Sequence, residues 1–485
     1  MTTVLVVGAG PTGLTLALDL ARRGTPVRVV EKTPGFAIGS RGKGLSPRTL
    51  EVLDDLGVID EVLASGVTHL PHRKYRGAEV VTEVDAVAGV RPSAEVPYPV
   101  GLLIPQWRVE EILRERLAGF GVSVELGAEL TTFSQDAAGV TALVDGAEIR
   151  AEYLVGCDGG RSPVRKALGI GFLGETSETQ LMACGDVKVD GLDRDAWHQW
   201  FTAGGAMMLC PLPGTDSFQV QASPEYGPDG TPLEPTLTRF QQTFDRVAGV
   251  PGVRLHDLAW RSSYRVNTRM VDRFRSGRVF LAGDAAHVHP IAGGLGMNTG
   301  IQDAYNLGWK LGLVHAGLAG PGLLDTYEEE RLPIASWLLN ITTELLDAVL
   351  EAVKAADGGL NSVMSPEISQ LGIGYPWSRL ALRTGGEWSG LRPGDRVPDG
   401  QYLDAESGAP IRLFDLFRGA HFTLLGLGPD TAPALRALEP HPAVRGRVVH
   451  AEGSSGLALV RPDGHLGLLA APDDPDQIAR YLELA

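Results

Sequence analysis

The sequence is poor in cysteine. Its 485 residues contain three, Cys157, Cys184 and Cys210. An odd number of cysteines cannot form a complete set of disulfides, and these three lack the close spacing of metal ligands, so neither a disulfide framework nor a metal site is expected. Two of them lie in or beside expected strands, where cysteine commonly serves as a small buried hydrophobe. We therefore expect a protein of a reducing compartment, the cytoplasm.

Positive charge is also scarce. The chain has 43 Lys and Arg residues against 59 Asp and Glu, a formal net charge of -16. Nucleic acids and anionic membranes bind clustered positive charge, so neither is an expected partner. No uninterrupted apolar run approaches the roughly 20 residues of a membrane span. The first apolar run breaks at Gly8 without a basic start, unlike a signal peptide.

Glycine, in contrast, is abundant, with 62 residues. Glycines permit tight turns and close approaches of the backbone to a ligand. The length of the chain suggests about three domains. A monomer and a homodimer are both compatible with the sequence.

The first glycine-rich motif lies near the N-terminus. A strand predicted over 4–7 is followed by Gly8-Ala9-Gly10-Pro11-Thr12-Gly13, a helical pattern, a second strand over 26–30 and Glu31. This order of strand, glycine turn, helix, strand and acidic residue is typical of a dinucleotide-binding βαβ unit. Glu31 would accept hydrogen bonds from the adenosine ribose, and the pyrophosphate would lie at the helix N-terminus after Gly13.

The second motif follows a buried strand predicted over 279–282. Gly283 and Asp284 form a corner, and a loop containing Pro290, Gly294 and Gly296 leads into a helix with apolar residues at helical spacing. The carboxylate of Asp284 could hold the hydroxyls of a polyol chain. Free amides over 296–298 could hold developing negative charge. Both features favour a flavin as the ligand.

Two shorter segments add charge and a further turn. Arg41 could be a bidentate partner of a pyrophosphate, or a solvated loop arginine. A strand predicted over 151–157 ends at Asp158-Gly159, and Ser162-Pro163 then begins a helix. By itself the Asp158-Gly159 pair is equally compatible with a simple turn.

A second sheet is expected from two separate segments. Extended stretches over 72–104, including Glu95 to Ile104, and strands predicted over 181–189, 207–212 and 218–222 lie away from the dinucleotide unit. The large apolar side chains here fit a substrate pocket and an ordinary sheet core equally well. The candidate pocket residues are Tyr98, Trp197, Phe201, Met207 and Ile291.

The last segment reads as a separate βα unit after a composition break near Gly385-Gly386. Strands are predicted over 421–427, 447–450 and 457–461, and helices over 432–438 and 475–484. It contains no cysteine, which excludes dithiol chemistry there.

Taken together, these motifs resemble the class A, single-component flavin monooxygenases, the flavoprotein aromatic hydroxylases. The resemblance rests on the Gly8-x-Gly10-x-x-Gly13 turn with Glu31, on Cys157-Asp158-Gly159, and on Gly283-Asp284 with Pro290 and its glycines. Arg392-Pro393-Gly394-Asp395 and the 459–464 segment resemble the C-terminal domain of a subgroup that acts on polyketide antibiotics and similar polycyclic phenols. One departure is Ile291, where relatives commonly have a second proline.

The resemblance implies an α/β fold with three parts. They are a Rossmann-like FAD-binding domain of the glutathione-reductase type, an inserted β-sheet substrate domain, and a C-terminal thioredoxin-like domain that lacks Cys-x-x-Cys. The expected boundaries are 1–71, 105–177 and 266–385 for the first, 72–104 and 178–265 for the second, and 391–485 for the third.

The resemblance also assigns residues to a non-covalently bound FAD. Gly8, Gly10, Thr12, Gly13, Glu31 and Lys32 would surround the ADP half, with Leu130 beside the adenine. Arg41 and Gln106 would lie near the pyrophosphate and ribityl chain, and Asp284 on the ribityl hydroxyls. Met297 and Asn298 would meet the isoalloxazine through their backbone. Asp158 and Gly159 are the position that the family uses for FAD and NAD(P)H contacts.

The chemistry implied is reduction of FAD by NADPH or NADH, capture of O2 as a flavin C4a-hydroperoxide, and hydroxylation of a polycyclic aromatic. The protein's task in such chemistry is positioning, electrostatics and exclusion of water, so no catalytic residue is assigned. Tyr98, His72 and Tyr264 could assist phenol deprotonation or be structural.

Other functions fit the same motifs. Baeyer-Villiger or ring-opening oxygenation of the same substrate class and a flavin-binding module without turnover stay open. Biosynthesis and antibiotic resistance are equally compatible roles. A halogenase lacks support, because the Trp-x-Trp-x-Ile-Pro signature is absent and the segment from Trp197 to Trp200 does not match it.

Overall fold

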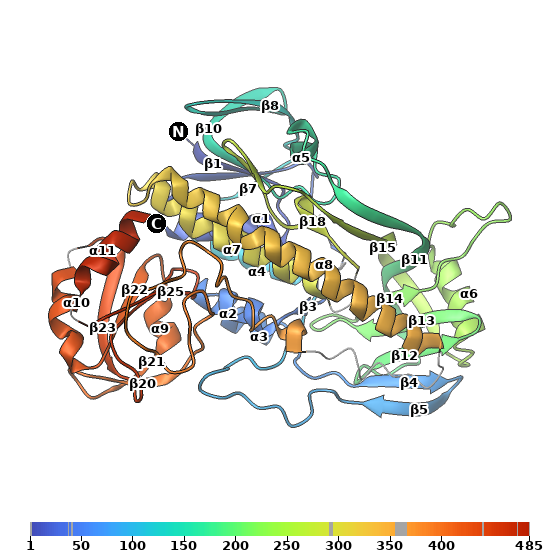
Figure 1. Cartoon of the computed structure of the whole chain (residues 1–485). Helices are drawn as coiled ribbons and strands as arrows, with labels where there is room; N and C mark the ends of the chain where they lie inside the picture. Colours follow the sequence, from blue (N-terminus) through green and yellow to red (C-terminus); the bar gives the residue numbers. More distant parts are fainter. Residues whose placement is uncertain are drawn as a thin grey trace.

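The computed structural model describes residues 2–36, 38–39, 42–290, 294–354, 366–438, 441–472 and 474–484. These residues form two eight-stranded sheets, a seven-stranded sheet and a two-stranded ribbon. Figure 1 shows the first sheet at the top, the second at the right and the third at the left, with long helices passing between them.

The first sheet carries both glycine-rich motifs. Its strand order is β16-β17-β10-β1-β2-β7, and β17, β10, β1, β2 and β7 pair in parallel. The strands are β1 (Thr2–Val7), β2 (Val27–Glu31), β7 (Val124–Leu126), β10 (Ala147–Gly156), β16 (Arg275–Ser276) and β17 (Val279–Leu281). An antiparallel extension from β10 is formed by β8 (Leu130–Asp136) and β9 (Gly139–Val144). The carboxyl-terminal parts of β1 and β10 are apolar and buried, as is typical of parallel strands that are covered on both faces.

Helices of this part pack together on the sheet. Helix α1 (Pro11–Arg22) lies against α4 (Gln106–Ala118) and α7 (Leu295–His315). The shorter helices are α2 (Pro47–Asp55), α3 (Ile59–Ala64) and α5 (Pro163–Ala167). Strand β17 pairs beside β10, with Leu154 opposite Val279, although the second sheet separates them in the sequence. The turn after β10 and the turn after β17 therefore lie at the carboxyl ends of neighbouring strands, where open α/β sheets bind ligands.

The second sheet has the order β18-β15-β11-β14-β13-β12-β4-β5. Its strands are β4 (His72–Arg76), β5 (Glu79–Val84), β11 (Leu173–Asp190), β12 (Trp197–Thr202), β13 (Gly205–Pro211), β14 (Ser217–Ala222), β15 (Arg254–Met270) and β18 (His287–Val288). One face packs on α6 (Leu237–Val247), and buried residues of the sheet and of this helix form a common core. Strands were expected in both segments that build this sheet.

One extended prediction is wrong. Between Glu95 and Ile104 the structure contains a single short strand, β6 (Leu102–Leu103), which pairs with β3 (Gly44–Leu45) and not with the second sheet. Pro97 and Pro99 lack the N–H group that a sheet ladder needs, which accounts for the irregular backbone before β6.

The third sheet contains the C-terminal residues in the order β19-β25-β24-β22-β23-β20-β21. Its strands are β19 (Leu382–Arg383), β20 (Gln401–Asp404), β21 (Pro410–Arg412), β22 (Phe422–Leu427), β23 (Val444–His450), β24 (Leu457–Val460) and β25 (Leu466–Ala470). The helices are α9 (Leu413–Phe417), α10 (Ala432–Leu438) and α11 (Pro475–Leu484). The last two have the predicted bounds, whereas α9, β20, β21 and β25 were not predicted.

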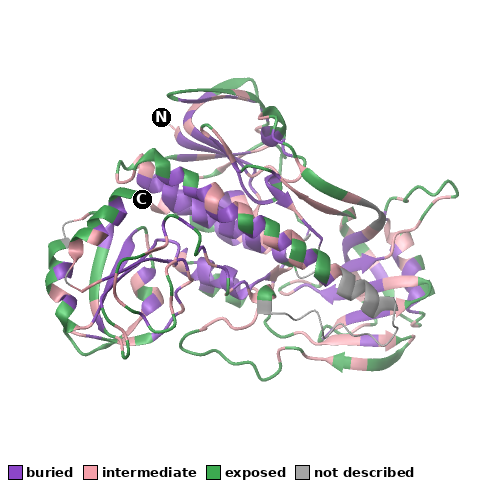
Figure 2. Cartoon of the chain, viewed as in Figure 1, coloured by how far each residue is buried: buried purple, intermediate pink, exposed green. Residues whose placement is uncertain are grey.

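A long helix, α8 (Asp325–Lys354), follows α7 and contains Pro333. It crosses the front of the molecule in Figure 1, and Figure 2 shows buried residues concentrated where α7 and α8 meet the sheets. Among the described helices, none is both long enough and apolar enough to cross a membrane.

Candidate functional site

The first glycine turn joins β1 to α1. Gly8 has a φ of +104°, and a methyl group on it would collide with the carbonyl oxygen of Cys157. A methyl group on Gly13 would collide with the carbonyl of Gly8. Gly10 has an ordinary φ of -76° and its missing side chain faces open space. Helix α1 has neither a side-chain cap nor an acidic residue in its first turn, so its first amides stay available to an anion.

Glu31 is fixed beside this turn at the end of β2. Its Oε2 accepts a hydrogen bond from the Ala9 N–H (3.0 Å), and its Oε1 accepts from the N–H and the hydroxyl of Thr33 (both 3.0 Å). Lys32 is exposed next to it, and Leu130 is buried at the start of β8. The carboxylate is thus oriented toward the turn before any ligand binds.

The second turn presents a carboxylate. Gly283 has a φ of +61° and, like Ala285, is buried, whereas Asp284 between them is exposed. The Gly283 N–H donates to Oδ2 of Asp303 (3.0 Å) on α7. The turn is therefore anchored to α7 through Gly283, while Asp284 is exposed.

Thr12 joins the two turns. A methyl group on Gly283 would lie 2.5 Å from Oγ1 of Thr12, and one on Gly300 of α7 would collide with the same atom. These two glycines are therefore required by the side chain of the first turn.

Beneath the second turn lies a buried ionic network that the sequence did not predict. Asp303 accepts hydrogen bonds from His287 Nε2 and from Arg331 Nε, each at 2.7 Å, and Arg331 also donates to the Tyr375 hydroxyl (3.0 Å). Burial alone would raise the pKa of Asp303, but the charges of Arg331 and His287 outweigh burial and lower it. No signal in the sequence indicated this network, because its members come from separate segments that only the fold brings together.

The N-terminus of α7 is formed by Gly294, which has a φ of +65° and provides no side-chain cap. The buried side chain of Asn298 accepts from the Ser46 N–H (2.8 Å) and donates to the carbonyls of Gly44 (3.0 Å) and Gly294 (2.8 Å). Asn298 therefore fixes the neighbouring loops through its side chain, and a ligand would meet its backbone.

His289 lies against the same helix start. A methyl group on Gly296 would lie 2.8 Å from its Nε2, while its Nδ1 donates to the carbonyl of the buried Pro290 (2.7 Å). Burial, and then the charge of His287, lowers the pKa of His289 to about 4. The imidazole is therefore neutral near pH 7.

Gln106 holds the loop that faces α7. Its Oε1 accepts from the Gly42 N–H (3.1 Å) and its Nε2 donates to Glu110 (2.8 Å). The side chain of Met297 also lies near Gly42. The predicted residues Arg41 and Ile291 lie outside the described part of the chain.

The third turn follows β10. Gly159 has a φ of +79°, and Asp158 accepts from the Val164 N–H (3.0 Å) through Oδ2. Burial raises the pKa of Asp158. Arg165 donates to the carbonyls of Ala285 (2.9 Å) and Gly160 (2.8 Å) and so joins the third turn to the second. Sequence reasoning missed Arg165, because only the fold brings these carbonyls together.

The expected pocket residues divide between the two faces of the second sheet. Met207 belongs to the apolar core under α6, with Phe240 and Phe244, so its assignment to the pocket is wrong. Trp200 of β12 also belongs to this core. Because side chains alternate between the two faces of a strand, Trp197 and Phe201 lie on the opposite face.

Tyr98 belongs to a different interface. Its hydroxyl donates to Asp54 (2.8 Å), which also binds Arg412 and Arg418 of the C-terminal segment. Burial, together with the charge of Asp54, raises its pKa. These contacts contradict its placement in the pocket and support its structural interpretation.

Of the other two candidate bases, Tyr264 donates to the His289 carbonyl (2.8 Å), and burial followed by the charge of Asp284 raises its pKa. His72 lies 4.9 Å from Trp197, ring to ring, and burial with two lysine charges lowers its pKa to about 4. Tyr264 is therefore protonated and His72 uncharged near neutral pH.

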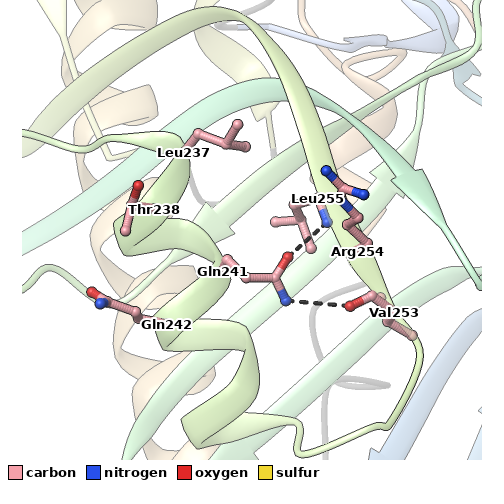
Figure 3. A pocket seen from close by; sticks show the side chains of 7 residues that line it. All are labelled: Leu237, Thr238, Gln241, Gln242, Val253, Arg254 and Leu255. Atoms are coloured by element: carbon pink, nitrogen blue, oxygen red, sulfur yellow. Dashed lines mark hydrogen bonds between the residues drawn. The ribbon is translucent and has the colours of Figure 1, made fainter.

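A shallow groove lies elsewhere, between α6 and the start of β15. Figure 3 shows Gln241 at its centre, accepting from the Leu255 N–H (2.7 Å) and donating to the Val253 carbonyl (3.3 Å). It shares no residue with the three turns. Among the described residues, no group of His, Cys, Asp and Glu is placed to hold a metal ion.

Comparison with known proteins defines the class. A family model described as an FAD binding domain matches residues 1–342, and the chain belongs to this family of FAD-binding flavin monooxygenases. It is 44% identical to a flavin-dependent monooxygenase of Mycobacteroides abscessus, over 96% of this chain and 97% of that protein. It is 38% identical to the 6-methylpretetramide 4-monooxygenase of Streptomyces rimosus, over 96% of this chain and 86% of that protein.

The fold agrees with a solved structure. The ternary complex of aklavinone-11 hydroxylase with FAD and aklavinone superposes with a TM-score of 0.83 and 31% identity, over 99% of this chain and 98% of that one. The protein is a flavin-dependent monooxygenase, and FAD is its cofactor. These comparisons confirm the predicted family, enzyme class and cofactor.

The described residues fit FAD on their own chemistry. Open space at Gly10 and Gly294, uncapped amides at the starts of α1 and α7, and the fixed carboxylate of Glu31 form complementary contacts for a dinucleotide. The assignment of individual residues to parts of FAD stays a prediction.

Proposed function

We propose that this enzyme consumes NADPH or NADH and hydroxylates a polycyclic aromatic, a polyketide-like or antibiotic phenol. The observation that carries the proposal is a face of the second sheet on which Gln219, Gln199 and Asp186 are buried. Lys43 donates a hydrogen bond to Gln219 of this face from the loop that Asn298 joins to the start of α7. The names of its relatives support it, because one acts on 6-methylpretetramide and another is bound to aklavinone.

In this proposal, Gly8, Gly10, Thr12, Gly13, Glu31 and Lys32 hold the ADP half of FAD, and Asp284 holds its ribityl chain. Leu130 and Gln106 complete the adenine and pyrophosphate sides, and Asp158 with Gly159 contacts FAD and NAD(P)H. Gly294, Gly296, Met297 and Asn298 meet the ring. Bound FAD supplies the redox and oxygen-transfer chemistry.

The chain's own contribution is positioning. Uncapped amides of α7 favour negative charge at the edge of a ring placed against them. Asn298 and Gln106 both hold the loop over 42–46, and Asn298 also binds the carbonyl of Gly294 at the start of α7, so the loop and the helix start are held together. No side chain is assigned as a catalytic base.

We also propose the three-domain division given by the sequence, with a thioredoxin-like C-terminal domain. Its support is a parallel pair, β22 and β23, joined through α10 and followed by the β24–β25 hairpin and α11. The first two domains would share the ligand, and the third would pack on α7 and α8 through Arg461 and Asp463.

The test is NADPH oxidation by the FAD-loaded protein with a panel of polycyclic phenols, followed by mass analysis of the products. Stimulated oxidation and a product carrying one hydroxyl oxygen more are expected. Ring insertion or opening would identify Baeyer-Villiger or ring-opening chemistry. Phenol binding without stimulated oxidation would identify a binding module and overturn the proposal.

A further inference from the structure

The face of the second sheet opposite α6 carries two adjacent rows of residues, the polar rows, in which polar side chains predominate. Strand register places them, because residues opposite each other on paired strands share a face. The first row contains Asp186, Gln219, Cys210, Trp197 and His72, and the second contains Cys184, Gln221, Met208, Gln199 and Lys74. The alternate residues of β14, Phe218 and Val220, lie in the core under α6.

Several polar members of these rows are buried. Gln219 is 1% exposed, Gln199 2% and Asp186 3%. Polar side chains are seldom gathered in a plain sheet core, so a face of this composition suits a polar ligand.

Lys43 contacts the polar rows from outside the second sheet. It stands in the loop before β3, between Gly42, which Gln106 holds, and Gly44, which Asn298 holds. Its Nζ donates to Gln219 Oε1 and lies 4.3 Å from the centroid of the Trp197 ring. Lys43 therefore connects the loop at the start of α7 with the polar rows.

The charge balance of this region differs from that of the whole chain. Burial, followed by the charges of Lys74 and Lys43, lowers the pKa of His72, and burial lowers the pKa of Lys43 against the opposing charge of Asp186. With His72 neutral, Lys43 and Lys74 supply positive charge to this face, in a chain with a net charge of -16. Two lysines gathered on one face favour an anionic ligand.

Two buried atoms on this face have no hydrogen-bond partner among the described residues. They are Nε1 of Trp197, a donor, and Oε1 of Gln199, an acceptor. A ligand with an anionic oxygen and a neighbouring hydroxyl would satisfy both atoms. An ordinary core would leave each one unpaired, which lowers stability.

We propose that Lys43 determines substrate specificity by binding an ionised oxygen of the aromatic substrate against the polar rows, with Trp197 and Gln199 completing the contacts. The inference rests on the proposed function and narrows it to substrates that carry an acidic phenol, enol or carboxylate. Lys43 is a binding residue here and takes no proton.

The test compares ionised and neutral forms of one ring system. Dissociation constants of the FAD-loaded protein are measured by tryptophan quenching at neutral pH. The probes are alizarin, whose phenol ionises readily, its dimethyl ether, the carboxylate rhein and the methyl ester of rhein. Alizarin and rhein distinguish a phenolate from a carboxylate as the source of the anionic oxygen.

Lys43→Met is expected to weaken binding of at least one ionised probe by about tenfold, and to change binding of its neutral counterpart by less than about twofold. Lys43→Arg is expected to restore most of the loss because it keeps the charge. Lys188→Met is the matched control, since Lys188 pairs with Asp216 and Asp257 at the exposed end of β11.

Equal weakening of ionised and neutral probes by Lys43→Met, or no weakening, would overturn the inference. So would a wild-type protein that binds no ionised probe below about 1 mM. NADPH oxidation measured on the same samples keeps the two proposals apart. Charge-selective binding without stimulated oxidation supports the inference and overturns the hydroxylase proposal, whereas stimulated oxidation with unselective binding does the reverse.

Discussion

Asp303 and Arg331 form an ion pair in which Nε lies 2.7 Å from Oδ1, with both side chains at most 1% exposed. The other carboxylate oxygen of Asp303 holds the Gly283 N–H, one residue before Asp284. The second turn is thus anchored by a buried charge that does not itself face the ligand.

Asp303→Asn is expected to lower the free energy of unfolding by about 3 kcal/mol, because Arg331 would stay buried without its carboxylate. FAD affinity should fall as well, because the Gly283 turn loses its anchor. Urea denaturation and FAD titration measure the two effects. Asp145→Asn is the control, since Asp145 is exposed with a φ of 47°, which asparagine also adopts. An unchanged stability would show that the pair contributes nothing net.

The pH dependence follows from the lowered pKa of Asp303. A carboxylate whose pKa is lower in the folded state stabilises the fold above its unfolded pKa of about 3.9. That stability is lost as pH falls through the lower folded value. The wild type should therefore lose more stability than Asp303→Asn between neutral and strongly acidic pH.

Gly10→Ala separates folding from cofactor binding. The φ of Gly10 suits alanine and its methyl group would enter open space, so stability should change by less than about 1 kcal/mol. FAD affinity is expected to fall at least about tenfold, because the methyl group occupies the place predicted for the pyrophosphate. Gly13→Ala is the counterpart, since its methyl group would strike the Gly8 carbonyl and should destabilise the fold itself. Retained FAD affinity in Gly10→Ala would contradict the assignment.

Glu330 lies at the contact between α8 and the C-terminal segment. It accepts hydrogen bonds from Lys310 (2.7 Å) and Arg461 (2.7 and 2.9 Å), and all three side chains are fully buried. Burial would raise the pKa of Glu330, but Arg461 and Lys310 lower it to about 2. Its stabilising contribution is therefore present above pH 4.5 and is lost as pH falls toward 2.

Glu330→Gln is expected to destabilise the protein by about 3 kcal/mol, because two cations would lose their carboxylate. The adjacent Glu329→Gln should cost less than about 1 kcal/mol, since Glu329 pairs with the half-exposed Arg379 at the surface. Thermal unfolding of both variants checks this difference. Equal losses would contradict the ranking.

Tyr264→Phe tests a candidate base. The raised pKa of Tyr264 keeps its hydroxyl protonated through the neutral range, where it donates to the His289 carbonyl. The variant should keep the pH profile of NADPH oxidation and lose about 1 kcal/mol of stability. Loss of the alkaline limb of that profile in the variant would contradict this prediction and would indicate that Tyr264 acts as a base.

How much the sequence predicted depended on the range of the contacts. The Gly8 to Gly13 turn with Glu31 is local, so spacing was enough to predict it. The bounds of α10 and α11 followed from local periodicity in the same way. The contacts of Arg165, Asp303 and Arg331 are created only by the tertiary fold. These residues belong to no motif with a fixed spacing, so the sequence did not predict their roles.

Side-chain direction was the second limit. Met207 and Trp197 were equally good pocket candidates as large apolar residues, yet the register of β12 and β13 places them on opposite faces. A shift of one residue in a strand reverses the face, and the sequence does not fix register to that precision. For the same reason the polar rows became visible only once five strands were aligned.

Thr12 also has a consequence for cofactor selection by size. It belongs to the turn proposed for the ADP half, and it packs against Gly283 and Gly300 at the turn proposed for the flavin half. One small side chain in contact with two glycines therefore holds the two turns close together. FMN, which lacks the adenylate, would occupy only the second turn, so we expect it to bind more weakly than FAD.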